Sequence, residues 1–348
     1  MFYKGSPLFG HPFSKPNRDQ VVKISLDIVN SLHPATSVTP VFARHETFHP
    51  RFGWLKKGFD AANTDSEIFL REDAPVRLGV GKNMARSIRY WCNAFKVLAE
   101  DSASNQKARC AAPTDFGSKL LGDDGWDPFL EDPASLWLLH WKLLSPPCYA
   151  TAWNFIFNHF LRSEFSVDDL FIDLCSYRDS LSIATAESSL KKDITCILRM
   201  YAQDAKTGPN EDTLDCPFTE LGILATARQF EGRTSSPSTA SGDSKHYTFR
   251  VGAKTNLPAE IIVSACLEFA SWVGREQKTI SISRLTFDPG SPGMAFKLNE
   301  SAISQGIEQV CARWDAIGFS DTAGLIQLSY TQDPAMLAED VLNRYYRN

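Results

Sequence analysis

The sequence has no long hydrophobic run. Its most apolar segment, LWLLHWKLL at 136–144, is interrupted by His140 and Lys142. A membrane-spanning helix needs about 20 apolar residues in succession, so none is expected here. The opening residues, MFYKGSPLFGHPF, also lack the basic-then-apolar pattern of a signal peptide. These absences predict a cytoplasmic protein.

Paired cysteines are missing as well. The eight cysteines are scattered along the chain, and no two are spaced as Cys-x-x-Cys. Isolated cysteines in a cytoplasmic chain are usually small core residues. A structural zinc site is therefore not indicated.

A strong net charge is also lacking, but the charge is unevenly distributed. The whole chain carries −5, whereas residues 42–98 contain ten Lys/Arg against six Asp/Glu. A local basic segment can bind nucleic acid even when the total charge is negative. This segment is the first candidate for a binding surface.

The hydrophobic pattern predicts an α+β fold, mainly helical with small β-hairpins. We expect an extended, proline-containing arm at 1–40 and a winged-helix-turn-helix-like DNA-binding domain at 41–122. A helical domain at 123–230 and a flexible Ser-rich loop at 231–245 follow. Residues 246–348 are expected to form a C-terminal winged-helix-like α/β domain.

Several element boundaries are predicted from caps and turns. Helices are expected at 188–203, with a Ser cap, at 257–273, after Asn299, and at 334–346. TISISRLTF at 279–287 has the composition of a strand, and a hairpin should turn near 321–324.

The segment LGVGKNMARSIRYWCNAFKVLAED at 78–101 is the most informative. An α-helix starting near Lys82 places one apolar stripe inward and a basic stripe on the opposite face. A short helix, a glycine turn and a helix with a basic face together resemble a helix-turn-helix, whose second helix enters the major groove. Arg can read guanine and Asn can read adenine. The predicted DNA-binding residues on this face are Lys82, Asn83, Arg86, Arg89, Asn93 and Lys96. The alternative is a solvated basic face on an ordinary helix.

The stretch HETFH at 45–49 matches the HExxH pattern of zinc metalloproteases. That motif works on a long helix, which places both histidines on one face. Pro50 follows His49 directly and disfavours helix there, so a zinc protease is not favoured and no zinc is expected. The alternative is that these polar residues position the next segment, GWLKKG. Its Lys56 and Lys57 would extend the DNA-binding surface.

Long sequence segments resemble a bacterial family of unknown-function domains that is similar to SspB, the DNA-binding and nicking component of Ssp-type DNA phosphorothioation systems. The matching segments are RHETFHPRFGWLKKGFDAA, LGVGKNMARSIRYWCNAFKVL, PTDFGSKLLGDDGWDPFLEDPASLWLLHWKLL, DITCILRMY, EDTLDCPFTELGIL and PGSPGMAFKL. Together they cover most of residues 42–346.

The resemblance implies a role in replacing a non-bridging phosphate oxygen of DNA with sulfur. The implied partners are double-stranded DNA, a cysteine desulfurase, an ATPase and an ATP-pyrophosphatase-like protein. The chain would either nick one DNA strand or act as a non-catalytic adaptor or regulator that presents DNA to the sulfur-transfer enzymes.

A nicking activity would call for a metal or an acid–base pair. Mg²⁺ or Mn²⁺ is the expected cofactor, since most nucleases use such ions to stabilise the leaving oxygen. His45 and Glu46 are the predicted catalytic pair, because they adjoin the basic segment. The densest acidic run, GDDGWDPFLED, is an alternative site, although Asp132-Pro133 is typical of a helix start.

Overall fold

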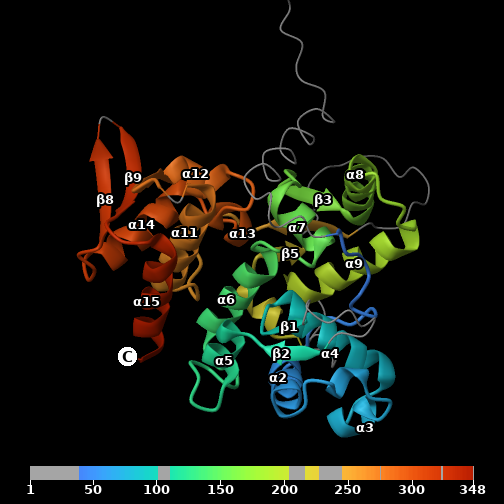
Figure 1. Ribbon diagram of the computed structural model, residues 1–348. Helices are drawn as coiled ribbons and strands as arrows, with labels where there is room; N and C mark the ends of the chain where they lie inside the picture. The colour runs from blue at the N-terminus through green and yellow to red at the C-terminus, as the bar shows by residue number, and fades with distance from the viewer. Residues whose placement is uncertain are drawn as a thin grey trace, which may run out of the picture.

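The computed structural model describes residues 39–100, 110–203, 216–226, 245–274, 276–322 and 324–347. Three units surround a central helix, α6 (Pro133–Leu144), as Figure 1 shows. The predicted α+β class is confirmed. Almost all of the arm predicted at 1–40 and of the Ser-rich loop lies outside the described residues. Within the described part, none of the helices has the length and apolar character needed to cross a membrane.

The N-terminal unit contains a run of helices, a strand pair and one further helix. Its elements are α2 (Trp54–Thr64), η2 (Ile68–Leu70), α3 (Ala74–Leu78), α4 (Lys82–Ala94), β1 (Leu98–Glu100), β2 (Ala111–Pro113) and α5 (Asp115–Leu121). Strands β1 and β2 are antiparallel, with Leu98 opposite Pro113. Helices α2 and α4 approach closely at Gly58, where a Cβ would lie 2.5 Å from the Cys92 Sγ. This packing turns the opposite side of α4 toward solvent.

The middle unit combines helices with a four-stranded sheet. Its elements are α7 (Thr151–Asn158), β3 (Glu164–Ser166), α8 (Val167–Ser180), α9 (Glu187–Tyr201), β4 (Ala202–Gln203), η3 (Pro217–Leu221), β5 (Leu224–Thr226) and β6 (His246–Phe249). The strand order is β3-β6-β5-β4. Strand β6, which the sequence analysis placed in the C-terminal domain, therefore pairs with strands on the other side of that boundary.

The C-terminal unit contains α11 (Ala259–Val273), β7 (Thr279–Ser281), α12 (Ile282–Phe287), α13 (Pro292–Phe296), α14 (Glu300–Cys311), β8 (Ile317–Thr322), β9 (Leu325–Tyr330) and α15 (Pro334–Arg347). The predicted hairpin and the helix after Asn299 are confirmed, and the Asn299 side chain caps α14. The strand predicted at 279–287 is wrong beyond Ser281. The Ser281 side chain accepts from the Arg284 N–H and starts a helix instead.

The middle and C-terminal units share one connectivity. Apart from β4 and η3 in the middle unit and α13 in the C-terminal unit, each runs helix, strand, helix, helix, strand, strand, and in each the first strand pairs antiparallel with the last. The core of this order is α7-β3-α8-α9-β5-β6 in the middle and α11-β7-α12-α14-β8-β9 at the C-terminus. Helices α9 and α14 therefore occupy equivalent positions in the two units.

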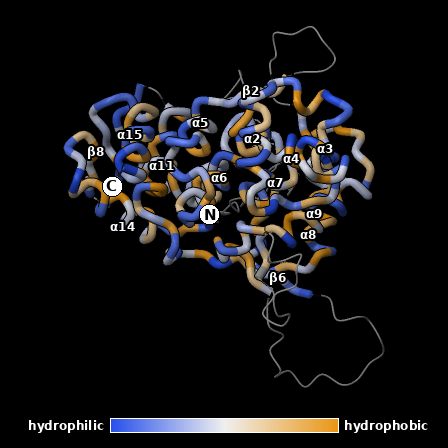
Figure 2. The backbone as a smooth tube through the Cα atoms, turned by 90° about the horizontal axis from the view of Figure 1, so that it is seen from below, coloured by the Kyte–Doolittle hydropathy of each residue, from blue (hydrophilic) through white to orange (hydrophobic). Residues whose placement is uncertain are grey.

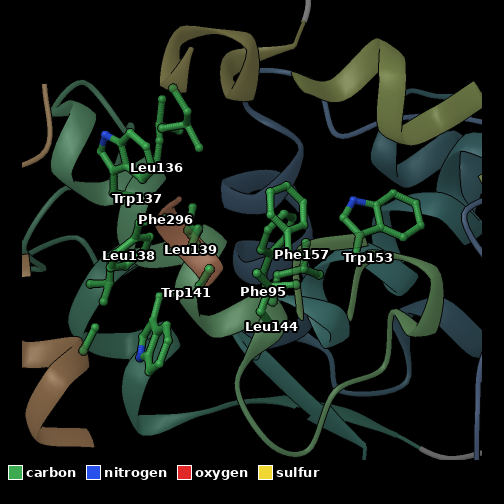
Figure 3. Packing of buried hydrophobic residues seen from close by; sticks show 14 of the residues in the cluster. Phe95, Leu136, Trp137, Leu138, Leu139, Trp141, Leu144, Trp153, Phe157 and Phe296 are labelled. Atoms are coloured by element: carbon green, nitrogen blue, oxygen red, sulfur yellow. The ribbon is translucent and has the colours of Figure 1, made fainter. Parts of the chain in front are cut away.

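The hydrophobic core joins all three units around α6. Apart from Pro133 and Lys142, every residue of this helix is buried. Figure 3 shows Trp137 and Trp141 of α6 in a cluster with Phe95 of the N-terminal unit, Phe157 of the middle unit and Phe296 of the C-terminal unit. A helix that is apolar all round must be covered on every side, which explains the central place of α6. In Figure 2 most surrounding helices carry both hydrophobic and hydrophilic segments, as helices that cover such a core should.

Candidate nucleic-acid interface

The first half of α4 presents the exposed polar residues that the sequence predicted. Gly79 has a φ of 63°, a left-handed conformation that glycine adopts without strain, and it ends α3 just before α4 begins. Lys82 and Asn83 are exposed in the first turn of α4. The Arg86 side chain is 57% exposed, and its guanidinium lies 3.9 Å from the Glu46 carboxylate. These three side chains are accessible to a ligand.

The second half of α4 is largely neutralised. Arg89 donates to the Glu100 carboxylate at 2.8 and 3.1 Å, and Asn93 donates to the same carboxylate at 3.2 Å. Both side chains are half-buried. A DNA phosphate would have to compete with Glu100 for them. DNA contact by Arg89 and Asn93 stays a prediction, and it has less support than contact by Lys82, Asn83 and Arg86.

Lys96 points inward, which corrects its assignment to the DNA-facing stripe. Helix α4 ends at Ala94, and Lys96 lies beyond it with a left-handed φ of 60°. Its ammonium donates to the carbonyl oxygen of Lys142 and, at 2.6 and 2.7 Å, to the carbonyl and hydroxyl oxygens of Ser145. Burial lowers the pKa of Lys96 to about 7. The residue anchors the N-terminal unit to the end of α6.

Lys56 and Lys57 of α2 lie beside a surface hollow of about 500 Å³ that Arg77 and Phe129 also line. Lys56 forms ion pairs with Asp60 at 2.7 Å and Asp123 at 3.1 Å. Lys57 donates to the Leu78 carbonyl at 2.9 Å but remains exposed. Of the two, Lys57 is the better placed to meet a phosphate.

The HETFH stretch forms a turn and not a helix. Residues 44–47 are in turn conformation, and Ala43, Glu46 and Thr47 all have φ between 50° and 69°. The expectation that this stretch is not helical is therefore confirmed. His45 and His49 are both buried, at 0% and 5% exposure. Within the described part of the chain, no three His, Cys, Asp or Glu side chains are grouped as metal ligands.

His45 holds this turn against the middle unit. Its Nε2 lies 2.8 Å from the Asp193 carboxylate of α9, which also accepts from the Ala43 N–H at 3.0 Å. Burial raises the pKa of Asp193, although His45 opposes that shift. The imidazole ring packs against Trp91 of α4 and Trp153 of α7, with ring centroids 6.2 and 5.6 Å away. A fully buried imidazole with this partner is a structural group, which argues against the predicted catalytic role.

Glu46 remains accessible, with its side chain 36% exposed beside Arg86. Asp193, the partner of His45, escaped the sequence analysis because it lies 148 residues away on another helix. Only a sequence pattern that linked the two positions could have found it.

The carboxylates of the acidic run serve the local structure. Asp127 accepts from the backbone N–H groups of Glu131 and Asp132 at 2.9 and 3.0 Å. Asp132 caps α6 by accepting from the Ala134 N–H at 2.8 Å, and it accepts from the Tyr345 hydroxyl at 3.0 Å. The interpretation of this run as a helix-capping loop is confirmed for these two residues.

Comparison with known proteins finds one protein family and similar solved structures. A family model described as a protein of unknown function (DUF4007) matches residues 42–346. An SspB crystal structure and a magnesium ion-bound SspB crystal structure each share 39% sequence identity with this chain. Each match covers 89% of both chains with a TM-score of 0.79. No match is found among curated proteins.

Proposed function

The chain belongs to the DUF4007 family of proteins of unknown function, and from that premise we propose that it is a double-stranded-DNA-binding component of a DNA phosphorothioation system. The observation that carries the proposal is the accessible group Lys82, Asn83 and Arg86 at the leading end of α4. In a helix-turn-helix, these are the positions that reach base edges. The similarity to SspB over 89% of the chain supports the same system. The proposed protein partners are a cysteine desulfurase, an ATPase and an ATP-pyrophosphatase-like protein, in the cytoplasm.

DNA binding is tested by fluorescence anisotropy with a labelled duplex over a range of salt concentrations. We expect Lys82→Ala/Arg86→Ala to weaken binding, because a lost bidentate base contact costs about 1–3 kcal/mol. Each lost phosphate contact should lower the slope of log K against log salt by about 0.9. The matched control, Lys278→Ala/Arg347→Ala, removes the same charge from exposed positions of the C-terminal unit. Equal affinity of both variants and the unchanged protein would reject α4 as the DNA-contacting helix.

The proposed function has two alternative forms. The chain either nicks one DNA strand or presents DNA without catalysis. Mg²⁺ or Mn²⁺ belongs to the nicking form, and one similar structure is described as magnesium ion-bound SspB. The described residues offer no group of three metal-ligating side chains, so we derive no step through a metal. Glu46 is the accessible member of the predicted catalytic pair and lies beside Arg86.

Nicking is tested by relaxation of supercoiled plasmid in Mg²⁺, Mn²⁺ or EDTA. Glu46→Gln is the informative variant, since it keeps the size of the side chain and leaves the buried His45 in place. Metal-dependent open circles that disappear in Glu46→Gln would support nicking at this position. Open circles that persist in Glu46→Gln would show that the nicking site lies at other residues. Retained DNA binding without open circles would favour the adaptor form.

A further inference from the structure

Helix α9 occupies the same place in the middle unit that a groove-entering helix occupies in a helix-turn-helix module. It follows α8 and, after β4 and η3, precedes the antiparallel pair β5–β6, much as α4 follows α3 and precedes the antiparallel pair β1–β2. In such modules the second helix of the pair enters the major groove. By this connectivity, the solvent face of α9 is the face that would meet DNA.

That face is cationic. The buried side of α9 includes Leu190, Ile194 and Ile197, which pack into the core. The exposed positions recur at helical spacing and consist of Ser188, Lys191, Lys192, Thr195 and Arg199, after an exposed Glu187 in the first turn. Three cations and two hydroxyls are the side-chain types that bind DNA phosphates most often.

These cations are available for a ligand. Among the residues that the structure describes, neither Lys192 nor Arg199 forms an ion pair, and the Lys191 ammonium lies over the Phe171 ring at 4.8 Å. By contrast, Arg89 of α4 is already bound to Glu100. Within the described part of the chain, phosphate binding by Lys192 and Arg199 would not displace a carboxylate partner.

The turn at residues 43–46 connects α9 to α4. The Ala43 N–H and His45 both contact Asp193 of α9, and Glu46 approaches Arg86 of α4. Arg44 lies between these contacts and is exposed. Cations therefore occur on both helices and on the segment that joins them.

We propose that the solvent face of α9, with Lys191, Lys192 and Arg199, is a second surface that contacts the phosphates of duplex DNA. The inference rests on the proposed DNA-binding function and extends it to a second helix. The equivalent helix of the C-terminal unit shows that this charge is not a requirement of the shared connectivity. Its exposed residues are acidic, amide or hydroxyl side chains, including Glu300, Gln305 and Glu308.

The experiment measures duplex affinity and its salt dependence for the full chain. Lys191→Ala/Lys192→Ala/Arg199→Ala should weaken binding roughly tenfold or more at low salt and lower the salt slope by up to about 3, or about 0.9 per contact. The control variant, Lys278→Ala/Arg313→Ala/Arg347→Ala, removes the same charge from the C-terminal unit. It should change the affinity by less than about threefold, because only the overall charge of the protein is altered. Circular dichroism should show the same thermal unfolding for the α9 variant and the unchanged protein, because the three side chains are exposed.

Hydroxyl-radical footprinting separates a direct contact from a general charge effect. The α9 variant should lose protection over one part of the footprint while the part lost in Lys82→Ala/Arg86→Ala is kept. A variant with arginine in place of Lys191 and Lys192 keeps the positive charge and should therefore show the protection that the alanine variant loses. An α9 variant with unchanged affinity and footprint, beside an α4 variant that binds weakly, would overturn the second surface and leave the proposed function standing. Absence of duplex binding by the unchanged protein at low salt would overturn both.

Discussion

Two buried histidines hold the units of this molecule together, and they do so with different partners. His45 lies between the N-terminal and middle units and bonds to the Asp193 carboxylate. His140 of α6 lies between the middle and C-terminal units and bonds to the Tyr201 hydroxyl at 2.8 Å and the Ala295 carbonyl at 2.9 Å. A carbonyl can only accept, so the Nε2 of His140 donates and its Nδ1 accepts from Tyr201. One joint contains a carboxylate, and the other is built from neutral groups.

The two joints differ in the electrostatic cost of burying their polar groups. A buried carboxylate is costly unless it is paired, so Asp193 depends on His45 and on the Ala43 N–H. The neutral joint has a smaller electrostatic cost, but it requires His140 to stay uncharged. Burial among aromatic rings lowers the pKa of His140 to about 4. The first joint should therefore be the more sensitive to mutation, and the second the more sensitive to acid.

The largest effect is expected from Asp193→Ala. This change leaves the buried His45 imidazole and the Ala43 N–H without their acceptor, and loss of one partner from a buried pair costs roughly 3–5 kcal/mol. Urea unfolding followed by circular dichroism measures the loss. Asp193→Asn, which keeps an acceptor oxygen, is the control and should lose less. A loss below about 1 kcal/mol for the alanine variant would contradict this account of the joint.

Of the two joints, the second should respond more strongly to acid. The folded-state pKa of His140 lies below the unfolded value of about 6.5, so the unfolded chain binds more protons between pH 6.5 and 4. The contribution of His140 to the free energy of unfolding is complete above pH 6.5 and is lost as pH falls toward 4, by up to roughly 3 kcal/mol. Urea unfolding at pH 7.0 and 4.5 measures this loss.

The control for the acid effect is His140→Gln, which cannot titrate. The variant should be less stable at pH 7.0 but should lose less stability than the unchanged protein between the two pH values. Equal losses in both proteins would show that other groups control the acid response.

A smaller effect is expected from Tyr201→Phe. The change removes the hydroxyl that donates to the His140 Nδ1 and leaves a buried neutral acceptor unpaired, at a cost of about 1–2 kcal/mol. The ratio of this loss to that of Asp193→Ala tests the comparison directly. If the two losses were equal, the charge of Asp193 would not distinguish the joints.

The smallest effect concerns the backbone of the first joint. Thr47 is an exposed β-branched residue at a φ of 69°, a left-handed conformation that costs roughly 1–2 kcal/mol for residues other than glycine. Thr47→Gly removes that strain but adds freedom to the unfolded chain, so a net gain of about 0.5–1 kcal/mol is expected. Thermal unfolding measures it, with Thr64→Gly in the last turn of α2 as a control that should destabilise the protein.

Local sequence patterns predicted the helices well. The apolar stripe Met84, Ile88 and Trp91 identified α4, and the caps at Asp132 and Asn299 identified the starts of α6 and α14. Helix α9 forms as predicted, but it begins after Ala186 without a Ser cap. These features are set by neighbours within about four residues, which is the range that helix periodicity and capping report.

The errors arose where distant residues decide the structure. Lys96 continues the basic stripe in sequence, yet the carbonyls of Lys142 and Ser145 draw its side chain inward. The HETFH turn is explained by Asp193, and no local pattern contains that contact. Lys191, Lys192 and Arg199 of α9 were not among the predicted DNA-binding residues, because the sequence does not show that α9 precedes a pair of strands. Strands β5 and β6 have only three and four residues and are separated by a long insertion.

The aromatic cage around His45 also gives this joint an optical property. Trp91 and Trp153 are almost completely buried, and both indole rings lie against the same imidazole. Indole emission shifts to longer wavelengths when water reaches the ring, and a protonated imidazole quenches it. Separation of the N-terminal and middle units would therefore change the intrinsic fluorescence of the protein. The difference between the unchanged protein and Trp153→Phe would isolate the emission of Trp153, one of the two indoles beside His45.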